Sequence, residues 1–338
     1  MMNALRKILT RQAGTVLLNL LVRLFLCIVL IKEEFIMIVK SVYSPDVYRK
    51  IMNANQDKKD DIYRYELMLP FKGKWDCYHI PIKASKEGAY DIIMANNRMG
   101  LFPPSKVNLT TKDWIEAISD QNLWDVCRKS IENALERFIS KGIELKVQEY
   151  LFSIFLADPE NAYTKMNEGY CGDGGIPGFV MGWLIPNENN LRKLPAALAH
   201  ETNHNVRYQF IKWTNDITLG EMLVGEGLAE NFATAIHGEE FLGPWVSKTD
   251  PELLPLIKEI IHDGLNATGF ENITAYLYGD EMARMQCFPE VGLPYCAGYA
   301  VGYHLIKYYL QKTGISIEEA TILPHEEILK EVEEFWEA

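Results

Sequence analysis

The sequence predicts an α+β fold, in which a small β-sheet lies between a mostly helical N-terminal lobe and a helical C-terminal lobe. The 338 residues are 48% hydrophobic and 24% charged, a composition typical of a folded globular protein. Apolar residues recur at helical spacing over most of the chain. Near the middle, two short runs rich in β-branched and aromatic residues interrupt that spacing and predict strands.

Residues 37–144 are predicted to form the helical N-terminal lobe. Turn signals occur at 71–75 and 102–105, and the clearest helical pattern covers residues 110–142, with a break near Asp120. We find no functional motif in this region and interpret it as scaffold.

The predicted strands cover residues 145–156 and 176–185, and the second follows a glycine-rich turn at 172–175. A strand rich in glycine is often one that another part of the chain approaches closely. The rest of the chain is predicted to be helical, over residues 190–213, 219–237, 251–262, 295–312 and 315–336, with the last interrupted at Pro324.

Residues 1–36 differ from the rest of the chain, since they carry five basic and two acidic residues in a protein of net charge −12. The apolar stretch 14–31 reaches the lower length limit of a membrane-spanning helix. Arg23 near its centre disfavours an anchor, and the absence of a small-residue cleavage site disfavours a secretory signal. A third interpretation is that translation starts at Met37.

The remaining composition favours a cytoplasmic protein without a nucleic-acid partner. The six cysteines are widely scattered and form no CxxC pair, which is typical of reduced thiols. A net charge of −12 disfavours binding to a phosphate backbone. A membrane would be a partner only if residues 14–31 are a real anchor.

We expect N-terminal sequencing of the native protein to find Met37 as its first residue. A native start at Met2 or Ala4 would contradict this expectation and revive the anchor and signal interpretations.

The predicted helix at 190–213 contains the HExxH motif His200-Glu201-Thr202-Asn203-His204. A spacing of four places His200 and His204 on one helical face, where both imidazoles can bind one zinc ion. Glu201 would then accept a proton from a water that attacks a carbonyl, and deliver that proton to the leaving amine.

The position of a third ligand distinguishes the classes of zinc peptidase. Arg207 and Phe210 stand where a metzincin would have glycine and histidine, which excludes that class. Glu226, on the following predicted helix, is the favoured third ligand, and Glu230 one turn later is placed to bind the far nitrogen of a ligating histidine. Alternative ligands are Glu221, Asp216 and His237.

The segments HETNHNVR, GEGLAENFA and PYCAGYAVGYHLIKYYL together resemble a bacterial family of unknown function described as predicted zinc-dependent proteases. That family is similar to the gluzincins, the thermolysin-like peptidases, and the resemblance covers roughly residues 145–312. It implies that His200, His204 and Glu226 bind zinc and that Glu201 is the general base.

Two further parts of the site are expected from this resemblance. Gluzincins have an edge strand beside the cleft, and 178–184 is that strand by position, with Gly178, Phe179 and Val180 binding the substrate backbone. A donor for the oxyanion is also needed, and Tyr299 is favoured over Tyr295, Tyr303 and His304. Arg207 is expected to anchor a carboxylate, either that of Glu230 or that of the substrate.

The sequence therefore predicts a gluzincin-like zinc metallopeptidase, with one zinc ion per chain, a peptide or protein substrate, and a metal-bearing domain at 145–338. The alternatives are a catalytically silent zinc-binding regulatory protein and a membrane-anchored peptidase. The presence of Glu201 favours an enzyme, because metal binding alone does not require it.

Overall fold

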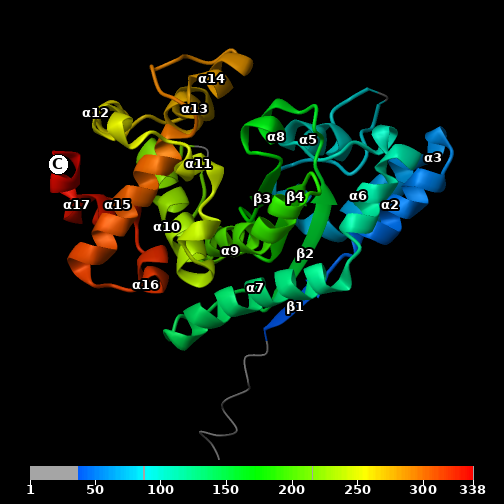
Figure 1. Cartoon of the computed structure of the whole chain (residues 1–338), viewed down its shortest axis with the longest axis horizontal. Helices are drawn as coiled ribbons and strands as arrows, with labels where there is room; N and C mark the ends of the chain where they lie inside the picture. The colour runs from blue at the N-terminus through cyan, green and yellow to red at the C-terminus, as the bar shows by residue number, and fades with distance from the viewer. Residues whose placement is uncertain (1–36, 87, 215, 338) are drawn as a thin grey trace, which may run out of the picture. The chain divides into compact units, whose positions relative to one another are not determined.

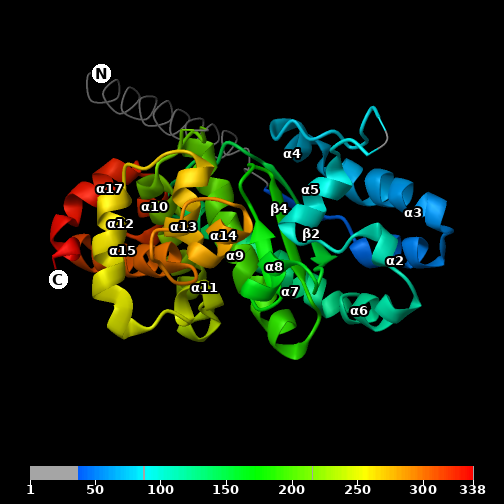
Figure 2. The ribbon, with the colours of Figure 1, turned by 90° about the horizontal axis from the view of Figure 1, so that it is seen from above.

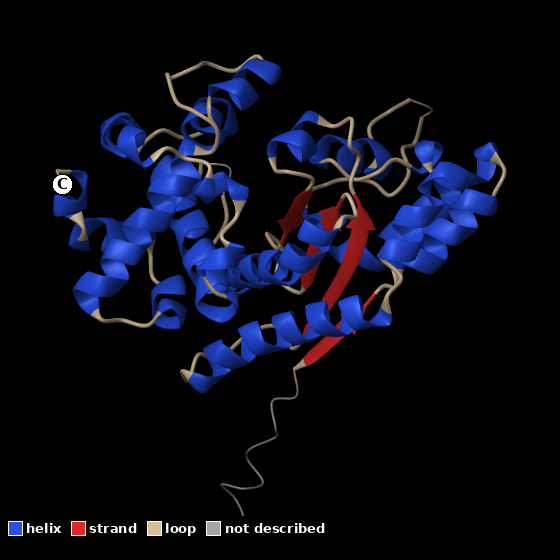
Figure 3. Cartoon of the chain, in the orientation of Figure 1, coloured by secondary structure: helices blue, strands red, loops and turns tan. Residues whose placement is uncertain are grey.

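A small mixed β-sheet runs through the middle of the α+β fold in the computed structural model, which describes residues 37–337 except 87 and 215 (Figures 1 and 3). Residues 1–38 and 39–338 form two separate units. The predictions made for residues 1–36 lie outside the described residues.

The helices within residues 44–117 lie on one side of the sheet and those within residues 188–331 on the other (Figure 2). The strands are β1 (Ile38–Ser41), β2 (Glu149–Leu156), β3 (Tyr170–Asp173) and β4 (Phe179–Leu184). The first helices are α2 (Ser44–Asn53), α3 (Gln56–Ile62), α4 (Lys72–Cys77), α5 (Ile92–Met99), α6 (Lys112–Ala117), α7 (Gln121–Ser140) and α8 (Ala162–Met166). They are followed by α9 (Glu188–Phe210), α10 (Leu219–His237), α11 (Pro244–Ser247), α12 (Leu254–Gly264), α13 (Phe270–Tyr278), α14 (Asp280–Met285), α15 (Ala297–Thr313), α16 (Ile317–Thr321) and α17 (His325–Glu331).

The strand order is β1-β2-β4-β3, which makes β3 an edge strand and β4 an internal one. β4 pairs in parallel with β2 and antiparallel with β3. The prediction that 178–184 is the edge strand is therefore wrong. The sequence hid the true edge because β3 is only four residues long and two of its neighbours on the C-terminal side are glycines.

Polar side chains of α9 set the limits of both predicted strands. The backbone N–H groups of Lys146 and Val147 donate to Gln209 Oε1 at 2.7 and 3.1 Å, and β2 begins only at Glu149. The buried Asn205 side chain accepts from Gly178 N at 2.8 Å and donates to the carbonyl oxygens of Gly174, Ile176 and Phe179, in the loop before β4 and at its first residue. Both strands are shorter than predicted because these backbone groups bond to side chains instead of to a neighbouring strand.

The bounds of the helices after the sheet were predicted more closely than those of the strands. The expected helix 219–237 is α10 with the same limits, and the expected breaks near Asp120 and at Pro324 are confirmed. Asp120 is the N-cap of α7 and accepts from Asn122 N at 3.0 Å. We did not predict β1, α13 or α14 from the sequence.

Helix α9 packs against β3 and β4, and α10 packs against both α9 and α15. The contact between α10 and α15 depends on Gly227 and Gly302. A Cβ atom on Gly227 would lie 2.1 Å from Gly302 O, and one on Gly302 would lie 2.4 Å from Leu223 O. The two backbones can approach this closely only because neither residue has a side chain.

Within residues 37–337, leaving out 87 and 215, we find no helix that is both long and apolar enough to cross a membrane. The apolar stretch 14–31 lies outside this range.

We expect Gly227→Ala to destabilise the protein by about 1–3 kcal/mol, because the added methyl group overlaps backbone atoms that cannot move aside. Gly225→Ala in the same helix is the matched control, since its Cβ would have no neighbour closer than 3.9 Å. The free energy of unfolding of that variant should rise by up to about 1 kcal/mol, because alanine has a higher helix propensity than glycine. Denaturant unfolding measures both, and equal effects of the two substitutions would contradict the close approach of α10 and α15.

Candidate metal centre and pocket

Helices α9 and α10 bring three potential metal ligands together in a buried position. His200 and His204 lie one turn apart on α9, with their Nε2 atoms 3.1 Å from each other. Glu226 of α10 places Oε2 3.2 Å from each of these nitrogens. All three residues are less than 10% exposed. The structure thus assembles the three residues that the helical spacing selected.

The chemistry of these three atoms fits a cation. His200 Nδ1 lies 2.8 Å from Glu230 Oε2, so a proton on Nδ1 bonds to that carboxylate and leaves the lone pair on Nε2. That lone pair faces the Glu226 carboxylate and the second imidazole, an arrangement that is repulsive without a positive charge between the groups. Four ligands at the usual zinc bond lengths of about 2.0–2.1 Å lie about 3.3 Å apart, close to the separations found here.

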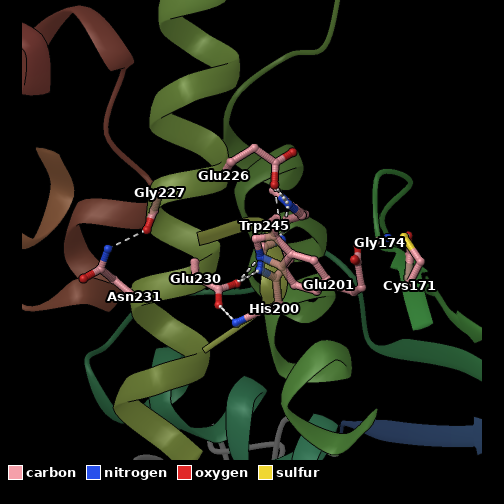
Figure 4. A network of polar contacts seen from close by, with 12 residues as sticks. Cys171, Gly174, His200, Glu201, Glu226, Gly227, Glu230, Asn231 and Trp245 are labelled. Atoms are coloured by element: carbon pink, nitrogen blue, oxygen red, sulfur yellow. Dashed lines mark hydrogen bonds and ion pairs between the residues drawn. The ribbon is translucent and has the colours of Figure 1, made fainter. Parts of the chain in front are cut away.

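The Glu230 carboxylate is fixed by three donors, as Figure 4 shows. Besides His200, Trp245 Nε1 donates to its Oε2 at 2.8 Å and Gly243 N donates to its Oε1 at 2.7 Å. The predicted contact between Glu230 and the far nitrogen of a histidine is present, and the other two donors were not foreseen. Glu230 is 2% exposed, so these contacts hold one His200 ring orientation in a dry environment.

Glu201 lies beside the cluster and is held by the loop after β3. Gly174 N donates to Glu201 Oε2 at 2.7 Å. A Cβ atom on Gly172 would lie 2.4 Å from Glu201 Cγ, and one on Gly174 would lie 1.9 Å from the Glu201 carbonyl oxygen. Burial raises the pKa of the Glu201 carboxyl above its ordinary value, although both histidines oppose that shift. The glycine-rich turn therefore allows the close approach that its sequence indicated.

The opposite shift applies to Glu226. Burial alone would raise its pKa, but when His204 and His200 are protonated, their charges and hydrogen bonds outweigh burial and hold the pKa well below its ordinary value. The pKa values of the two glutamates in the pocket are therefore shifted in opposite directions. Glu226 is ionised beside the histidines, and Glu201 is the more basic group.

These side chains open into a pocket of about 260 Å³. Its wall includes seven tyrosine and tryptophan rings, which come from Tyr78, Tyr163, Tyr208, Trp213, Trp245, Tyr278 and Tyr299. Tyr208 stacks on His204, with ring centroids 6.1 Å apart and planes 15° apart. Its position four residues after His204 was a signal for this placement that we did not use.

Of the four residues considered as oxyanion donors, Tyr299 lines this pocket and the other three do not. Burial raises the pKa of Tyr299 well above its ordinary value, so its hydroxyl keeps its proton. The Tyr295 hydroxyl donates to Asn167 Oδ1 at 2.8 Å instead. Tyr303 lies beside Lys307, and His304 is solvent-exposed.

The N-terminal helices also contribute to the pocket, which the sequence did not indicate. Tyr78, directly after α4, forms part of the wall. Lys74 of α4 is fully buried and places Nζ 2.6 Å from Asp173 Oδ1, an atom that also accepts from Gly175 N at 3.0 Å. The region that we interpreted as scaffold therefore supplies one wall residue and the counter-ion of an acidic residue at the edge of the pocket.

Arg207 binds neither of the carboxylates expected for it. Its guanidinium is fully buried, pairs with both oxygens of Glu221 at 2.9–3.0 Å, and donates to the carbonyl oxygens of Thr321 and Leu323. The prediction was wrong because Glu221 lies in the first turn of α10, within hydrogen-bond distance of the last turn of α9. Glu221 is thereby occupied and unsuited as a metal ligand.

The other residues considered as ligands or substrate contacts lie away from the cluster. Asp216 is exposed, and His237 Nε2 lies 2.8 Å from Ser130 Oγ. Gly178, Phe179 and Val180 do not line the pocket, since Asn205 holds this part of the chain. The strand beside the pocket is β3, which contributes Cys171, Gly172 and Asp173.

Comparison with known proteins identifies one family and one curated relative. A family described as "Predicted Zn-dependent protease (DUF2268)" matches residues 123–330. "Uncharacterized protein YjfC" of Bacillus subtilis (strain 168) is 34% identical over 285 residues, which cover 84% of this chain and 94% of that protein. No solved structure matches the chain.

We expect Arg207→Met to lower the free energy of unfolding by about 3–5 kcal/mol, because it leaves the Glu221 carboxylate buried beside His325 without the guanidinium. The double variant Arg207→Met/Glu221→Leu should recover much of that loss, since no uncompensated charge remains. Urea unfolding of both variants tests this, and a double variant no more stable than the single one would refute it.

Proposed function

The chain belongs to the family described as predicted Zn-dependent proteases, and from that premise we propose that it is a zinc-dependent metallopeptidase of the gluzincin type. The observation that carries the proposal is the convergence of His200 Nε2, His204 Nε2 and Glu226 Oε2 within 3.2 Å, beside the half-buried carboxylate of Glu201. A pure metal-binding site needs the first three groups and has no use for the fourth.

His200, His204 and Glu226 would hold one zinc ion per chain, and Glu230 would fix the ring and tautomer of His200. When bound, zinc supplies Lewis-acid polarisation of a carbonyl and lowers the pKa of a water towards about 7. The hydrogen bonds of Glu230 to Trp245 and Gly243 support this role, because a carboxylate already fixed by two donors cannot rotate away from His200.

Glu201 would act as the general base and then as the general acid. Its pKa is raised by burial, so its carboxylate is a better proton acceptor than an exposed one. The hydrogen bond from Gly174 N orients one oxygen and leaves the other to meet the attacking water. The proton accepted there passes to the amine nitrogen as the peptide bond breaks.

Tyr299 would donate its hydroxyl hydrogen to the oxygen of the tetrahedral intermediate. Its ring lies 6.4 Å from that of Trp245, which itself contacts His200, so the phenol reaches the same pocket as the ligands. A raised pKa suits this role because the donor must stay protonated at neutral pH.

An extended substrate would pair with the outer edge of β3. Ile185 N donates to Gly169 O at 2.7 Å, so these two residues form a hydrogen-bonded pair of the antiparallel ladder. Hydrogen-bonded and non-hydrogen-bonded pairs alternate along such a ladder, and in the β3–β4 register Gly172 belongs to a non-hydrogen-bonded pair. The N–H and C=O of Gly172 therefore point away from β4, next to Glu201. This assigns to β3 the role that we had expected for residues 178–180.

We expect wild-type protein to contain one zinc ion per chain and to cleave a quenched peptide library. Glu201→Gln should keep the zinc, since Glu201 is not among the three converging ligands, and lose about 10²–10⁴-fold in kcat/KM. Metal analysis and the peptide assay on the same preparations measure both quantities.

The matched control is Glu188→Gln, an exposed glutamate in the first turn of the same helix, which should keep both zinc and activity. A wild type without stoichiometric zinc would refute the metal site. If wild type and Glu201→Gln both contain zinc and neither cleaves a peptide, the alternative of a catalytically silent zinc-binding protein would be favoured.

A further inference from the structure

A second and larger pocket, of about 600 Å³, adjoins the metal pocket. The two pockets share Tyr163, Gly172, Asp173 and Tyr278, so they meet at the free edge of β3. On one side the second pocket is bounded by the end of α5 and by α8. On the other it is bounded by α13 and α14, the helices that the sequence did not predict.

A continuous series of ring contacts leads from one pocket into the other. Within the metal pocket, Trp213 contacts Tyr208, Tyr208 stacks on His204, and His200 contacts Trp245. The series continues from Trp245 through Tyr299 and Tyr278 to Phe270, which lines the second pocket.

Both ends of this series are open to solvent, since Trp213 is 46% and Phe270 is 50% exposed. The metal ligands lie between the two ends. Exposed surface on either side of the ligands is what the binding of a polypeptide that extends past them in both directions would require.

The lining of the second pocket is suited to a bulky apolar side chain. Met99, Met282 and Met285 line it together with Phe270. Methionine side chains are flexible and polarisable, so they adapt to apolar groups of different shapes. Met285 and Phe270 are each about half exposed, which leaves apolar surface to be covered.

The pocket also contains a buried hydrogen-bond donor that has no acceptor among the described residues. Trp183 is 2% exposed, and its Nε1 has no hydrogen-bond partner within the described part of the chain. A donor of this kind can bind a backbone carbonyl of a ligand that enters the pocket. This favours a peptide over a purely apolar ligand.

We propose that the second pocket is a subsite for a leucine, methionine or phenylalanine side chain of an extended polypeptide, and that the protein is an endopeptidase. The proposal rests on the proposed function. The Gly172 backbone would hold the substrate strand where the pockets meet, and the side chain would enter between α8 and α14 on one side of the scissile bond.

The test is the cleavage of a mixture of N-acetylated, C-amidated peptides by wild type and by Met285→Lys, read by mass spectrometry. Wild type should cut inside these blocked peptides and favour Leu, Met or Phe at one fixed position, separate from the two residues at the bond. Met285→Lys should lower kcat/KM for those peptides by about tenfold or more, with little change for peptides that have alanine at that position.

Met94→Lys is the matched control, because Met94 is also 45% exposed and lines neither pocket. It should retain the wild-type preference. If wild type cleaves with no preference at a distant position, or if Met285→Lys cleaves as wild type does, the subsite is refuted while the proposed function stands.

Binding of a blocked leucine-containing peptide to Glu201→Gln, compared with Glu201→Gln/Met285→Lys, gives a second measurement that does not depend on turnover. We expect the additional lysine to weaken binding about tenfold. If wild type cleaves no peptide in the mixture, both the function and the subsite fail. Equal peptide affinity of the two proteins would refute the subsite alone.

Discussion

Three electron-rich atoms, two imidazole nitrogens and one carboxylate oxygen, are held within 3.2 Å of one another in a buried pocket, and the rest of the fold keeps them there. They come from two helices, so the placement of α10 against α9 decides their geometry. The buried Arg207–Glu221 pair ties the end of α9 to the start of α10. On its other side, α10 lies against α15 through two glycines that permit backbone contact. Together these contacts leave α10 little freedom to shift.

The parts of this arrangement that follow from helical periodicity were predictable from the sequence. His200 with His204, and Glu226 with Glu230, are pairs four residues apart, so each pair faces one side of its helix wherever that helix lies. The bounds of α10 and the break at Pro324 followed from the same regularity and from the chemistry of proline. The α+β class followed from the change of period in the middle of the chain.

Contacts between distant segments were not predictable in the same way. The partner of Arg207 depends on how α10 packs back on α9, and no local pattern encodes that. The order of the strands depends on a four-residue edge strand that is too short to show alternation. Lys74 contacts Asp173 across 99 residues of sequence, between a helix and the end of a strand whose proximity exists only in the folded chain.

The Lys74–Asp173 pair also bears on the smallest fragment that could keep the site intact. The family match begins at residue 123, whereas the buried ammonium group that neutralises Asp173 belongs to α4. A fragment cut at the start of the match would keep all three converging side chains and Glu201. It would nevertheless expose a bare carboxylate at the rim of the pocket and remove the Tyr78 wall. The working unit of this protein is therefore larger than the region by which its family is recognised.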